Sequence, residues 1–167
     1  VEGSPNSATS YPRLKGFLDV SASHPNARIV AQCCGNYQRQ DAKVAMRDIL
    51  ANHNNIDGIL AANDYMAFGI LDALNEFGRY ASIVGINAMP QAITAIKASK
   101  MEATAAFDAM KMACIATYAA TRILTGLPVP SVIELPVEIV NKNNCDLWDQ
   151  EYDERPLPNW EETVGFS

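Results

Sequence analysis

Residues 56–69 read Ile56-Asp57-Gly58-Ile59-Leu60-Ala61-Ala62-Asn63-Asp64-Tyr65-Met66-Ala67-Phe68-Gly69. The first half is a short apolar run, which is typical of a buried strand, and apolar residues then recur at helical spacing from Met66 to Phe77. Two polar residues, Asn63 and Asp64, stand where the predicted strand ends and the predicted helix begins. This strand–turn–helix unit indicates an α/β fold.

The same alternation continues on both sides of this unit. Apolar runs predict strands at 28–33, 56–62, 81–86 and 103–107, and a last extended stretch at 132–140 that is broken by Pro136. Apolar stripes predict helices that include residues 8–18, 42–50, 66–77, 90–96 and 109–124. Because strand–helix–strand crossovers are right-handed, such an order builds a mainly parallel sheet. We therefore predict a three-layer α/β fold with helices on both faces of the sheet.

Composition and charge restrict the class of function. The 167 residues are 49% hydrophobic and 19% charged, an ordinary balance for a globular chain with a real core. Seven acidic residues and only Arg155 lie between Asp146 and Glu162, which leaves 12 acidic and 12 basic residues elsewhere. A neutral body has no basic stripe for a phosphate backbone, so we expect no nucleic-acid partner. No apolar run reaches the roughly 18 residues that a membrane helix needs.

The acidic stretch at 146–167 is expected to be a solvated extension. Its aromatic residues, Trp148, Tyr152 and Trp160, are the side chains able to fix it to a surface. The two interpretations make opposite predictions about whether these rings are buried.

Catalytic motifs are scarce. The sequence has no Gly-x-Ser-x-Gly elbow, no phosphate-binding loop and no dinucleotide fingerprint after a strand. His24 and His53 fall at predicted helix ends without a metal partner at ligand spacing, and the four cysteines form no Cys-x-x-Cys pair. We therefore expect neither an enzyme nor a metal site, and no cofactor.

Polar and aromatic residues at the predicted strand ends indicate binding instead. A sugar has hydroxyls around its rim and apolar C–H faces, so its site combines amides and charged groups with an aromatic ring. The candidates are Arg13, Tyr37, Asn63, Asn87 and Asp108. Each also has a structural interpretation: the two asparagines and the aspartate as helix caps, the arginine as an exposed helix charge, and the tyrosine as a loop anchor.

Several stretches occur in the order found in one family. Residues 56–69 resemble the D-x-(I/V)-x-A-x-N-D-x-M-A-x-G segment of the sugar-binding proteins of ABC importers, of the ribose-binding type. Residues 83–90 resemble that family's V-V-G-(F/I)-D-(G/A)-x-P segment, and residues 100–106 its (K/E)-(L/M)-x-A-T-(V/I)-A segment. Residues 124–126 resemble the end of its last helix before V-P. The resemblance extends from Glu2 to about Asn144.

The resemblance implies a division of the chain into parts. Proteins of this family have two α/β lobes joined by three hinge strands, with the sugar between the lobes. Residues 1–107 are similar to the C-terminal lobe with most of its first strand missing. Residues 108–135 would form a hinge crossover with a helix and a strand of the other lobe, residues 136–145 the returning strand, and residues 146–167 an extension.

The resemblance also assigns roles to single residues. Arg13 matches an arginine that bonds ring and hydroxyl oxygens, Tyr37 an aromatic residue that stacks on the sugar, and Asn63 an asparagine that bonds hydroxyls. Asn87 stands where the family usually has an aspartate, and Phe107 where it commonly has a glutamine. These departures favour an unusual sugar or a sugar alcohol over ribose. Asp108, beside Phe107, is a further candidate as a compensating carboxylate, with hinge capping as the alternative.

Two functions follow from this resemblance. The first is the substrate-binding component of an ABC-type sugar importer, which binds a neutral sugar or sugar alcohol and delivers it to the membrane permease. Such a protein works in the periplasm, or outside the cell on a lipid anchor in a Gram-positive organism. The alternative is the effector-binding domain of a lactose-repressor-type transcription regulator. In either case, the helix at 109–124 is expected to expose an apolar face, so we expect the chain to self-associate.

Overall fold

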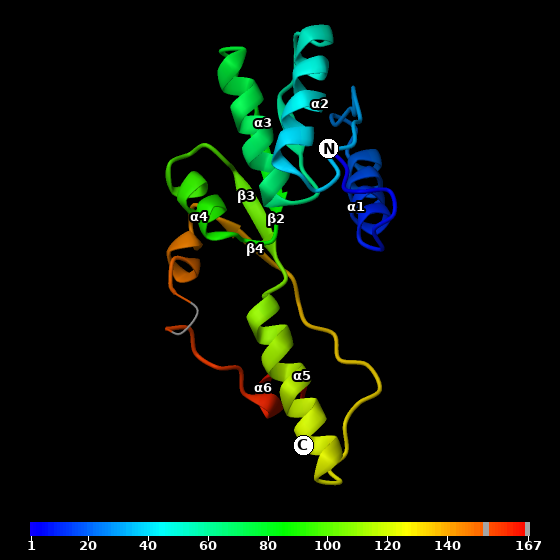
Figure 1. Cartoon of the computed structure of the whole chain (residues 1–167), viewed down its shortest axis with the longest axis vertical. Coiled ribbons are helices and arrows are strands. Elements are labelled where there is room, and N and C mark those ends of the chain that lie inside the picture. The colour runs from blue at the N-terminus through cyan, green and yellow to red at the C-terminus, as the bar shows by residue number, and fades with distance from the viewer. Residues whose placement is uncertain (152–153, 166–167) are drawn as a thin grey trace.

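A four-stranded sheet organises the computed structural model, which describes residues 1–151 and 154–165 (Figure 1). Its strands are β1 (Gly58–Leu60), β2 (Ser82–Ile86), β3 (Ala103–Ala106) and β4 (Glu138–Asn141), in the order β1-β2-β3-β4. The first three are parallel, and β4 pairs antiparallel with β3. The predicted mainly parallel α/β architecture is confirmed.

Five helices confirm the apolar stripes of the sequence. They are α1 (Ser10–Ser23), α2 (Arg39–Asn52), α3 (Asp64–Glu76), α4 (Pro90–Lys97) and α5 (Ala109–Leu124). Local signals set their ends: Asn63 caps α3 through its side chain, and Pro90 occupies the first turn of α4. Gly78 and Gly126 have φ values of 59° and 75° just beyond α3 and α5, which a residue with a Cβ adopts less readily.

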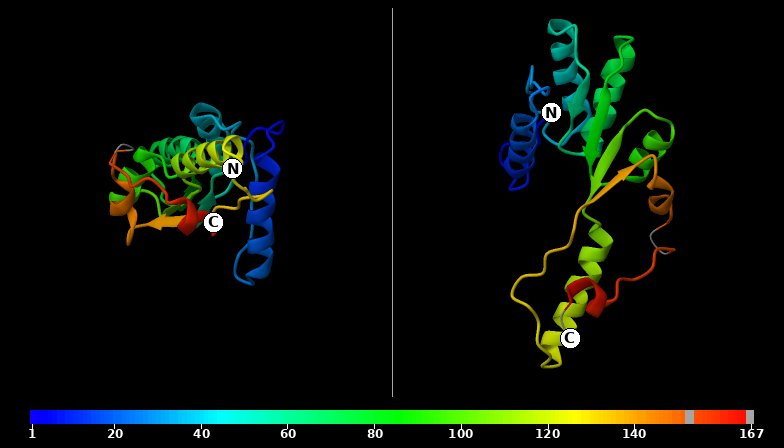
Figure 2. Two further views of the ribbon diagram at one scale, coloured as in Figure 1. Left: turned by 90° about the horizontal axis from the view of Figure 1, so that it is seen from below. Right: turned by 180° about the vertical axis from the view of Figure 1, so that it is seen from behind.

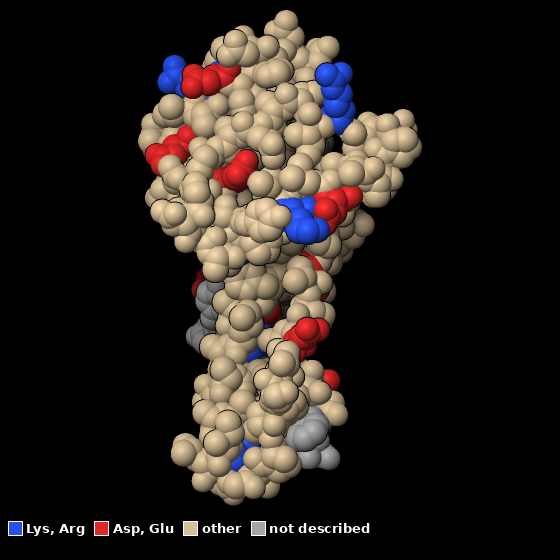
Figure 3. Space-filling view, turned by 90° about the vertical axis from the view of Figure 1, so that its right-hand side faces the viewer, with Lys and Arg blue, Asp and Glu red and all other residues tan. Residues whose placement is uncertain are grey.

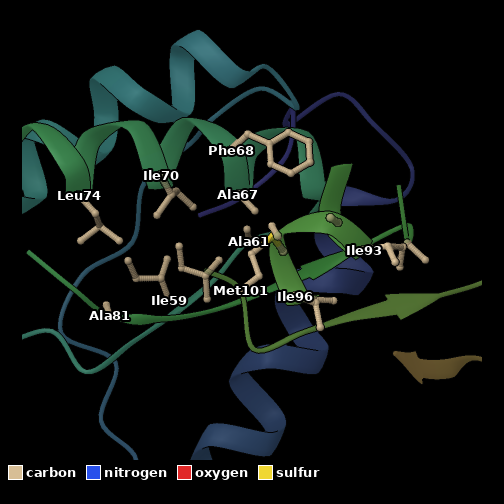
Figure 4. Packing of buried hydrophobic residues seen from close by; sticks show 14 of the residues in the cluster. Ile59, Ala61, Ala67, Phe68, Ile70, Leu74, Ala81, Ile93, Ile96 and Met101 are labelled. Atoms are coloured by element: carbon tan, nitrogen blue, oxygen red, sulfur yellow. The ribbon is translucent and has the colours of Figure 1, made fainter. Parts of the chain in front are cut away.

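The core lies between the sheet and α2, α3 and α4 (Figure 4). Ile70 and Leu74 of α3 point toward Ile59 of β1 and Ala81 beside β2, and Ile96 of α4 extends the same cluster. Ile70 is fully buried and Ile96 is 1% exposed. Helix α1 stands outside this core, since Ser10 is its one buried residue.

The predicted strand at 28–33 is wrong. Residues 28–33 have no strand conformation in the structure, and Cys34 alone forms an isolated parallel bridge, with Glu2. A strand persists only where a neighbouring backbone accepts and donates its hydrogen bonds. Here Glu2 bonds the backbone of Cys33 and Gly35. Among the described residues, no strand lies in hydrogen-bonding contact with residues 28–32.

The last extended stretch is also shorter than predicted. Of residues 132–140, only those from Glu138 onward belong to a strand, and residues 128–137 run without a ladder beside α5. Their apolar side chains, including Ile133 and Leu135, line a hollow against α5 instead. Residues 132–135 therefore have no strand partner among the described residues, and their place in a sheet of the other lobe stays a prediction.

Helix α5 projects from the sheet as an arm (Figures 1 and 2). The chain returns along the arm and re-enters the sheet as β4. We call α5 with residues 125–137 the α5 arm. On the face shown in Figure 3, Lys and Arg side chains are scattered over the sheet part and the arm and form no basic patch. No helix among the described residues has the length and apolarity to cross a bilayer.

The acidic extension is fixed at two places, so its prediction as a solvated tail is wrong for the described part. Lys97 pairs with Asp146 and Asp149, each at 2.6 Å, beside the short helix η1 (Cys145–Trp148). Farther on, α6 (Trp160–Val164) lies against α5, and Trp160 is only 6% exposed. The Arg122 guanidinium lies 5.0 Å from the Trp160 ring centroid. Tyr152, the other predicted anchor, lies outside the described residues, as does the neighbouring Asp153.

Candidate ligand-binding site

The carboxyl ends of the parallel strands bring several predicted residues to one edge of the sheet. Asn63 follows β1, Asn87 follows β2 directly, and Phe107 follows β3 directly. In open α/β sheets, ligands bind at this edge because the loops there converge and helix N-termini point toward it. Three of the predicted site residues therefore lie at this edge, and their contact with a ligand stays a prediction.

Arg13 is held between two aromatic rings at this edge. Its guanidinium carbon lies 5.7 Å from the centroid of Tyr37 and 6.0 Å from that of Phe107. Its Nη1 donates a 2.5 Å hydrogen bond to the carbonyl of Ala62, just before Asn63. The structure thus brings Arg13, Tyr37 and Phe107 together, and the alternative of Arg13 as a solvated helix charge is wrong.

Tyr37 anchors its loop. Its hydroxyl shares a 2.9 Å hydrogen bond with Thr9 Oγ1, and its ring covers Gly3, where a Cβ would lie only 2.1 Å from the ring Cζ. Tyr37 itself has a φ of 60°, which is uncommon for a residue with a Cβ. The loop-anchor interpretation is confirmed, and stacking on a ligand stays a prediction.

Asn63 caps α3. Its Oδ1 accepts a 2.8 Å hydrogen bond from the backbone N–H of Met66, and the residue is 8% exposed. The cap uses the carbonyl oxygen of the side chain, so the Nδ2 amino group is the part of Asn63 suited to donate to a ligand oxygen. The capping interpretation is confirmed, and it is compatible with binding.

The side-chain oxygen of Asn87 lacks a hydrogen-bond partner among the described residues. Its backbone N–H donates to the carbonyl of Ala105 at 2.9 Å, and its φ is 125°. Its Oδ1 is buried and has no partner among the described residues. Leaving a buried acceptor unpaired costs about 1–3 kcal/mol, a cost that a donor from a bound molecule removes. Asn87 does not cap α4, whose N-cap is Met89, so that interpretation is wrong.

Asp64 and Thr104 organise the loop that carries Asn87, and sequence reasoning missed them as parts of the site. Asp64 is fully buried; its Oδ2 accepts from the Met89 N–H at 2.8 Å and its Oδ1 from the Thr104 hydroxyl at 2.7 Å. Thr104 Oγ1 accepts from the Ala88 N–H at 3.1 Å. Burial raises the pKa of the Asp64 carboxyl. The Asn63-Asp64 pair was a visible signal, but its link to Thr104, 40 residues away, was not.

Gly85 leaves the space that Asp64 occupies. A Cβ at Gly85 would lie 2.1 Å from Asp64 Oδ1. The residue at this position of β2 must therefore be glycine, because any Cβ would collide with the Asp64 carboxylate. It allows one carboxylate to tie β2, β3 and the start of α3 together beneath the site.

Asp108 caps α5. Its Oδ1 accepts a 3.0 Å hydrogen bond from the Lys111 N–H, and its φ is 41°. It borders a hollow of about 220 Å³ together with Pro136 and Trp148, whereas Arg13 borders a different one. The capping interpretation is confirmed, and a ligand contact by Asp108 stays a prediction.

The hollow beside Arg13 has a volume of about 790 Å³. Arg13, Thr9 and Phe107 border it, and so do apolar residues of α5, including Met112 and Ile115. Of the predicted site residues, Arg13 and Phe107 border this hollow, whereas Tyr37, Asn63 and Asn87 are not among the residues that line it.

Amide, guanidinium and aromatic groups at the carboxyl edge of a parallel sheet are typical of the class of small-molecule binding domains. Among residues 1–151 and 154–165, no three His, Cys, Asp or Glu side chains are grouped so that they could hold a metal ion.

Residues 1–128 match the family model of the periplasmic binding protein domain, and the chain belongs to that family. It is 29% identical over 139 residues to the ribose import binding protein of Bacillus subtilis (strain 168), covering 83% of this chain and 45% of the relative. The chain spans about half the length of the curated relatives it matches.

Solved structures show the same fold. An ABC transporter periplasmic solute binding protein from Actinobacillus succinogenes 130z with bound D-allose superposes with a TM-score of 0.84 at 30% identity, covering 87% of this chain and 53% of that one. The Caulobacter myo-inositol binding protein, with myo-inositol bound, gives a TM-score of 0.75 at 29% identity, covering 86% and 50%. The fold is that of a lobe of a type I periplasmic binding protein.

Proposed function

We propose that the whole protein is the substrate-binding component of an ABC-type importer and reversibly binds a neutral sugar or sugar alcohol between two lobes. The observation that carries the proposal is the grouping of the Arg13 guanidinium with the Tyr37 and Phe107 rings, close to Asn63, at the carboxyl edge of the sheet. Relatives named for ribose, D-allose and myo-inositol support it, because all three ligands are neutral and rich in hydroxyls.

The residues at this edge suit such a ligand. Asn63 Nδ2 and the Arg13 guanidinium donate to ligand oxygens, and Asn87 Oδ1 accepts from a hydroxyl if its side chain turns toward the ligand. The Tyr37 and Phe107 rings offer surfaces for C–H groups. Asn87 is a neutral amide, so its bond to a hydroxyl lacks the charge assistance of a carboxylate. This favours a ligand that differs from ribose, such as a less common sugar or a sugar alcohol.

A permease of the membrane is the protein partner that this function requires, and the periplasm is its location, or the outer cell surface with a lipid anchor in a Gram-positive organism. Relatives named as import binding proteins support the importer over the transcription regulator. They are binding proteins by name, which also supports a role without catalysis.

The parts of the chain fit a two-lobe protein. We propose that residues 1–107 form the main part of one lobe, that residues 108–135 cross to the other, that residues 136–145 return, and that residues 146–167 extend the chain. Three apolar side chains of the α5 arm support the crossing, since they are widely exposed: Met112 at 47%, Ile123 at 65% and Leu124 at 86%. Another lobe, or a second copy of this chain, would cover them.

A thermal-shift panel on the whole protein tests the ligand class. Pentoses, hexoses, inositols and linear polyols are compared with amino acids and purines. We expect stabilisation by at least one sugar or polyol, since a ligand that binds only the folded state raises its stability. Stabilisation by amino acids or purines alone contradicts the proposal.

Two substitutions of Asn63 separate binding from capping. Asn63→Asp keeps the acceptor for the Met66 N–H but loses the Nδ2 donor and adds a carboxylate beside the buried Asp64, so we expect some loss of stability and ligand binding weaker by about 1–3 kcal/mol. Asn63→Ala loses both, and we expect an additional loss of about 1 kcal/mol of stability. Titration calorimetry and denaturant unfolding measure the two effects. Full affinity in Asn63→Asp excludes the residue from the site.

A further inference from the structure

The α5 arm joins the sheet part through two crossings that lie side by side. The chain enters the arm after Ala106 and returns at Glu138, and these two residues pair across β3 and β4. Residues 106–108 and 135–138 border the same hollow of about 220 Å³. Segments of a few residues that lie together in this way act as a hinge, about which the arm can rotate as a body.

A third connection is made by the acidic extension. It begins at η1, which packs against α4, and it ends at α6, which lies against α5 (Figures 1 and 2). We call this connection, which the structure describes at residues 145–151 and 154–165, the strut. Unlike the two crossings, it reaches the arm far from the hinge.

The base of the strut is fixed to the sheet part. Cys145 is 3% exposed and belongs to the core cluster, and Trp148 packs against the same cluster. The Trp148 Nε1 donates to Glu138 Oε1 at 3.4 Å, next to the hinge. The two ion pairs of Lys97 hold the same segment to α4. A movement of the sheet part therefore carries the base with it.

Arg155 extends this base. Its Nη2 donates to the Trp148 carbonyl at 3.0 Å and its Nε to the Gln150 carbonyl at 3.2 Å. Its guanidinium carbon lies 5.5 Å from the centroid of the Trp148 ring. The chain is thus tied back to η1 as far as residue 155.

Only residues 156–159 cover the remaining distance to the arm. They read Pro156-Leu157-Pro158-Asn159 and have neither helix nor strand conformation. Each proline fixes its own φ, and proline-rich segments are extended and stiff. At roughly 3.1 Å per residue, the steps from Arg155 to Trp160 cover about 15 Å. The strut therefore has little slack when the arm moves.

The far end of the strut holds α5 at a distance from the hinge. Trp160 is 6% exposed beside Arg122, and Asn159 Oδ1 caps α6 by accepting from the Glu162 N–H at 3.1 Å. Arg122 lies about 21 Å from Asp108 along α5, since a helix rises roughly 1.5 Å per residue. A rotation of about 10° would displace Arg122 by about 4 Å, which is enough to break packed contacts.

We propose that the strut limits the rotation of the α5 arm about its hinge and so narrows the range of orientations that the two lobes adopt. This inference rests on the proposed two-lobe function, because the arm then carries the second lobe. Of the described residues that line the hollow beside Arg13, none belongs to the strut, so its effect is on lobe orientation and not on ligand contacts. A narrow range lowers the ordering cost of binding a ligand between the lobes.

Distances between spin labels test the strut in the whole protein without ligand. One label replaces Tyr80 on the sheet part, which is 73% exposed, and the other replaces Thr125 at the end of α5. Labels carried by unnatural amino acids leave the native cysteines unchanged. We expect Trp160→Ala to widen the distance distribution about twofold or more, because it releases the arm from the strut. Leu157→Ala, which changes an exposed residue of the strut and neither of its ends, is the control and should keep the native width.

A second variant keeps the test independent of the folding of Trp160→Ala. Insertion of Gly-Ser-Gly-Ser between Pro158 and Asn159 keeps both ends of the strut and adds slack. We expect the same widening. A native width in both variants overturns the strut, and so does widening by Trp160→Ala alone, because α6 would then act only at its own contact with α5.

The ligand panel distinguishes this inference from the proposed function. Native widths in both variants together with stabilisation by a sugar or polyol overturn the strut alone. Widening in both variants without any such stabilisation overturns the sugar-binding proposal and supports the strut.

Discussion

Asp64 accepts hydrogen bonds from Met89 and Thr104 while its carboxylate is fully buried. Burial penalises the charged form and raises the pKa of this group above its ordinary value of 3.8, against the opposing effect of those hydrogen bonds. The folded state therefore binds this proton more tightly than the unfolded state. The contribution of Asp64 to stability is greatest below pH 3.8 and declines as the pH rises through the folded-state pKa.

Asp64→Asn removes this titration. We expect the stability of the native protein, relative to that of the variant, to fall as the pH rises above about 3.8 and to level off once the pH exceeds the raised pKa of Asp64 in the folded state. Urea unfolding at a series of pH values measures the difference. Asp57→Asn, which removes a carboxylate at an exposed position, is the control. A profile for Asp64→Asn that is parallel to that of the native protein contradicts the argument.

The residue scale also shows how far the candidate site could be predicted. Asn63, Asn87 and Arg13 could be identified because the pattern of apolar residues predicts where strands end and which face of a helix is buried. The pattern carried no information on the pairing of Asp64 with Thr104, nor on which polar atoms would stay unpaired. Those properties depend on atoms that come together only after the strands align.

At the scale of elements, α5 depends on its N-cap residue, Asp108, for its attachment to the sheet. Asp108 adopts a left-handed conformation and caps the helix through Lys111 N–H. Aspartate and asparagine tolerate this conformation better than alanine because their short polar side chains bond locally. The cap and the turn from β3 into the arm are therefore provided by one side chain.

Asp108→Ala should cost about 1 kcal/mol of stability through loss of the cap, with an added cost from the left-handed φ. Asp108→Asn retains both properties and should remain within about 0.5 kcal/mol of the native protein. Denaturant unfolding gives the free energies, and amide exchange at Lys111 and Met112 locates the effect. Indistinguishable alanine and asparagine variants would falsify the role of the cap.

Helices and strands differed in how well they could be predicted. The helices close their hydrogen bonds within their own sequence, so stripes, caps and Pro90 were sufficient to place them. The strand predicted at 28–33 needs a neighbour on the inner edge, which Val1 and Glu2 supply only at one end. The extension with η1 and α6 became ordered through Lys97 and Trp160, contacts that no local pattern contains.

At the scale of the whole molecule, the α5 arm presents its apolar side chains to solvent. Ile123 and Leu124 are the last residues of α5 and are 65% and 86% exposed. Helix α6 lies against α5, where Trp160 contacts Arg122, and leaves these two side chains uncovered. Burying such side chains is worth about 1.5–3 kcal/mol each. A second copy of the chain offers the same apolar surface, so pairing of arms would bury both.

The 167-residue chain should therefore self-associate. Light scattering should show a mass that rises with concentration from 18.2 kDa toward twice that value. Ile123→Glu combined with Leu124→Glu should restore the monomer, because pairing would bury four new charges. Tyr80→Glu, which changes an exposed aromatic residue outside the arm, serves as the control and should leave association unchanged. A monomer of 18.2 kDa at every concentration refutes the prediction.

The sequence by itself determined the alternation of strands and helices, the mainly parallel sheet, the zero net charge outside residues 146–162 and the family. Each of these follows from residue spacing, motifs or composition. The tertiary structure alone decided which backbone edges found partners, how Asp64 supports the loop of Asn87, where Asn87 Oδ1 stays unpaired, and where the acidic extension is fixed. The physical reason is that hydrogen-bond partners and burial are properties of pairs of groups. In this chain the decisive pairs, such as Asp64 with Thr104 and Val1 with Leu60, are 40 and 59 residues apart.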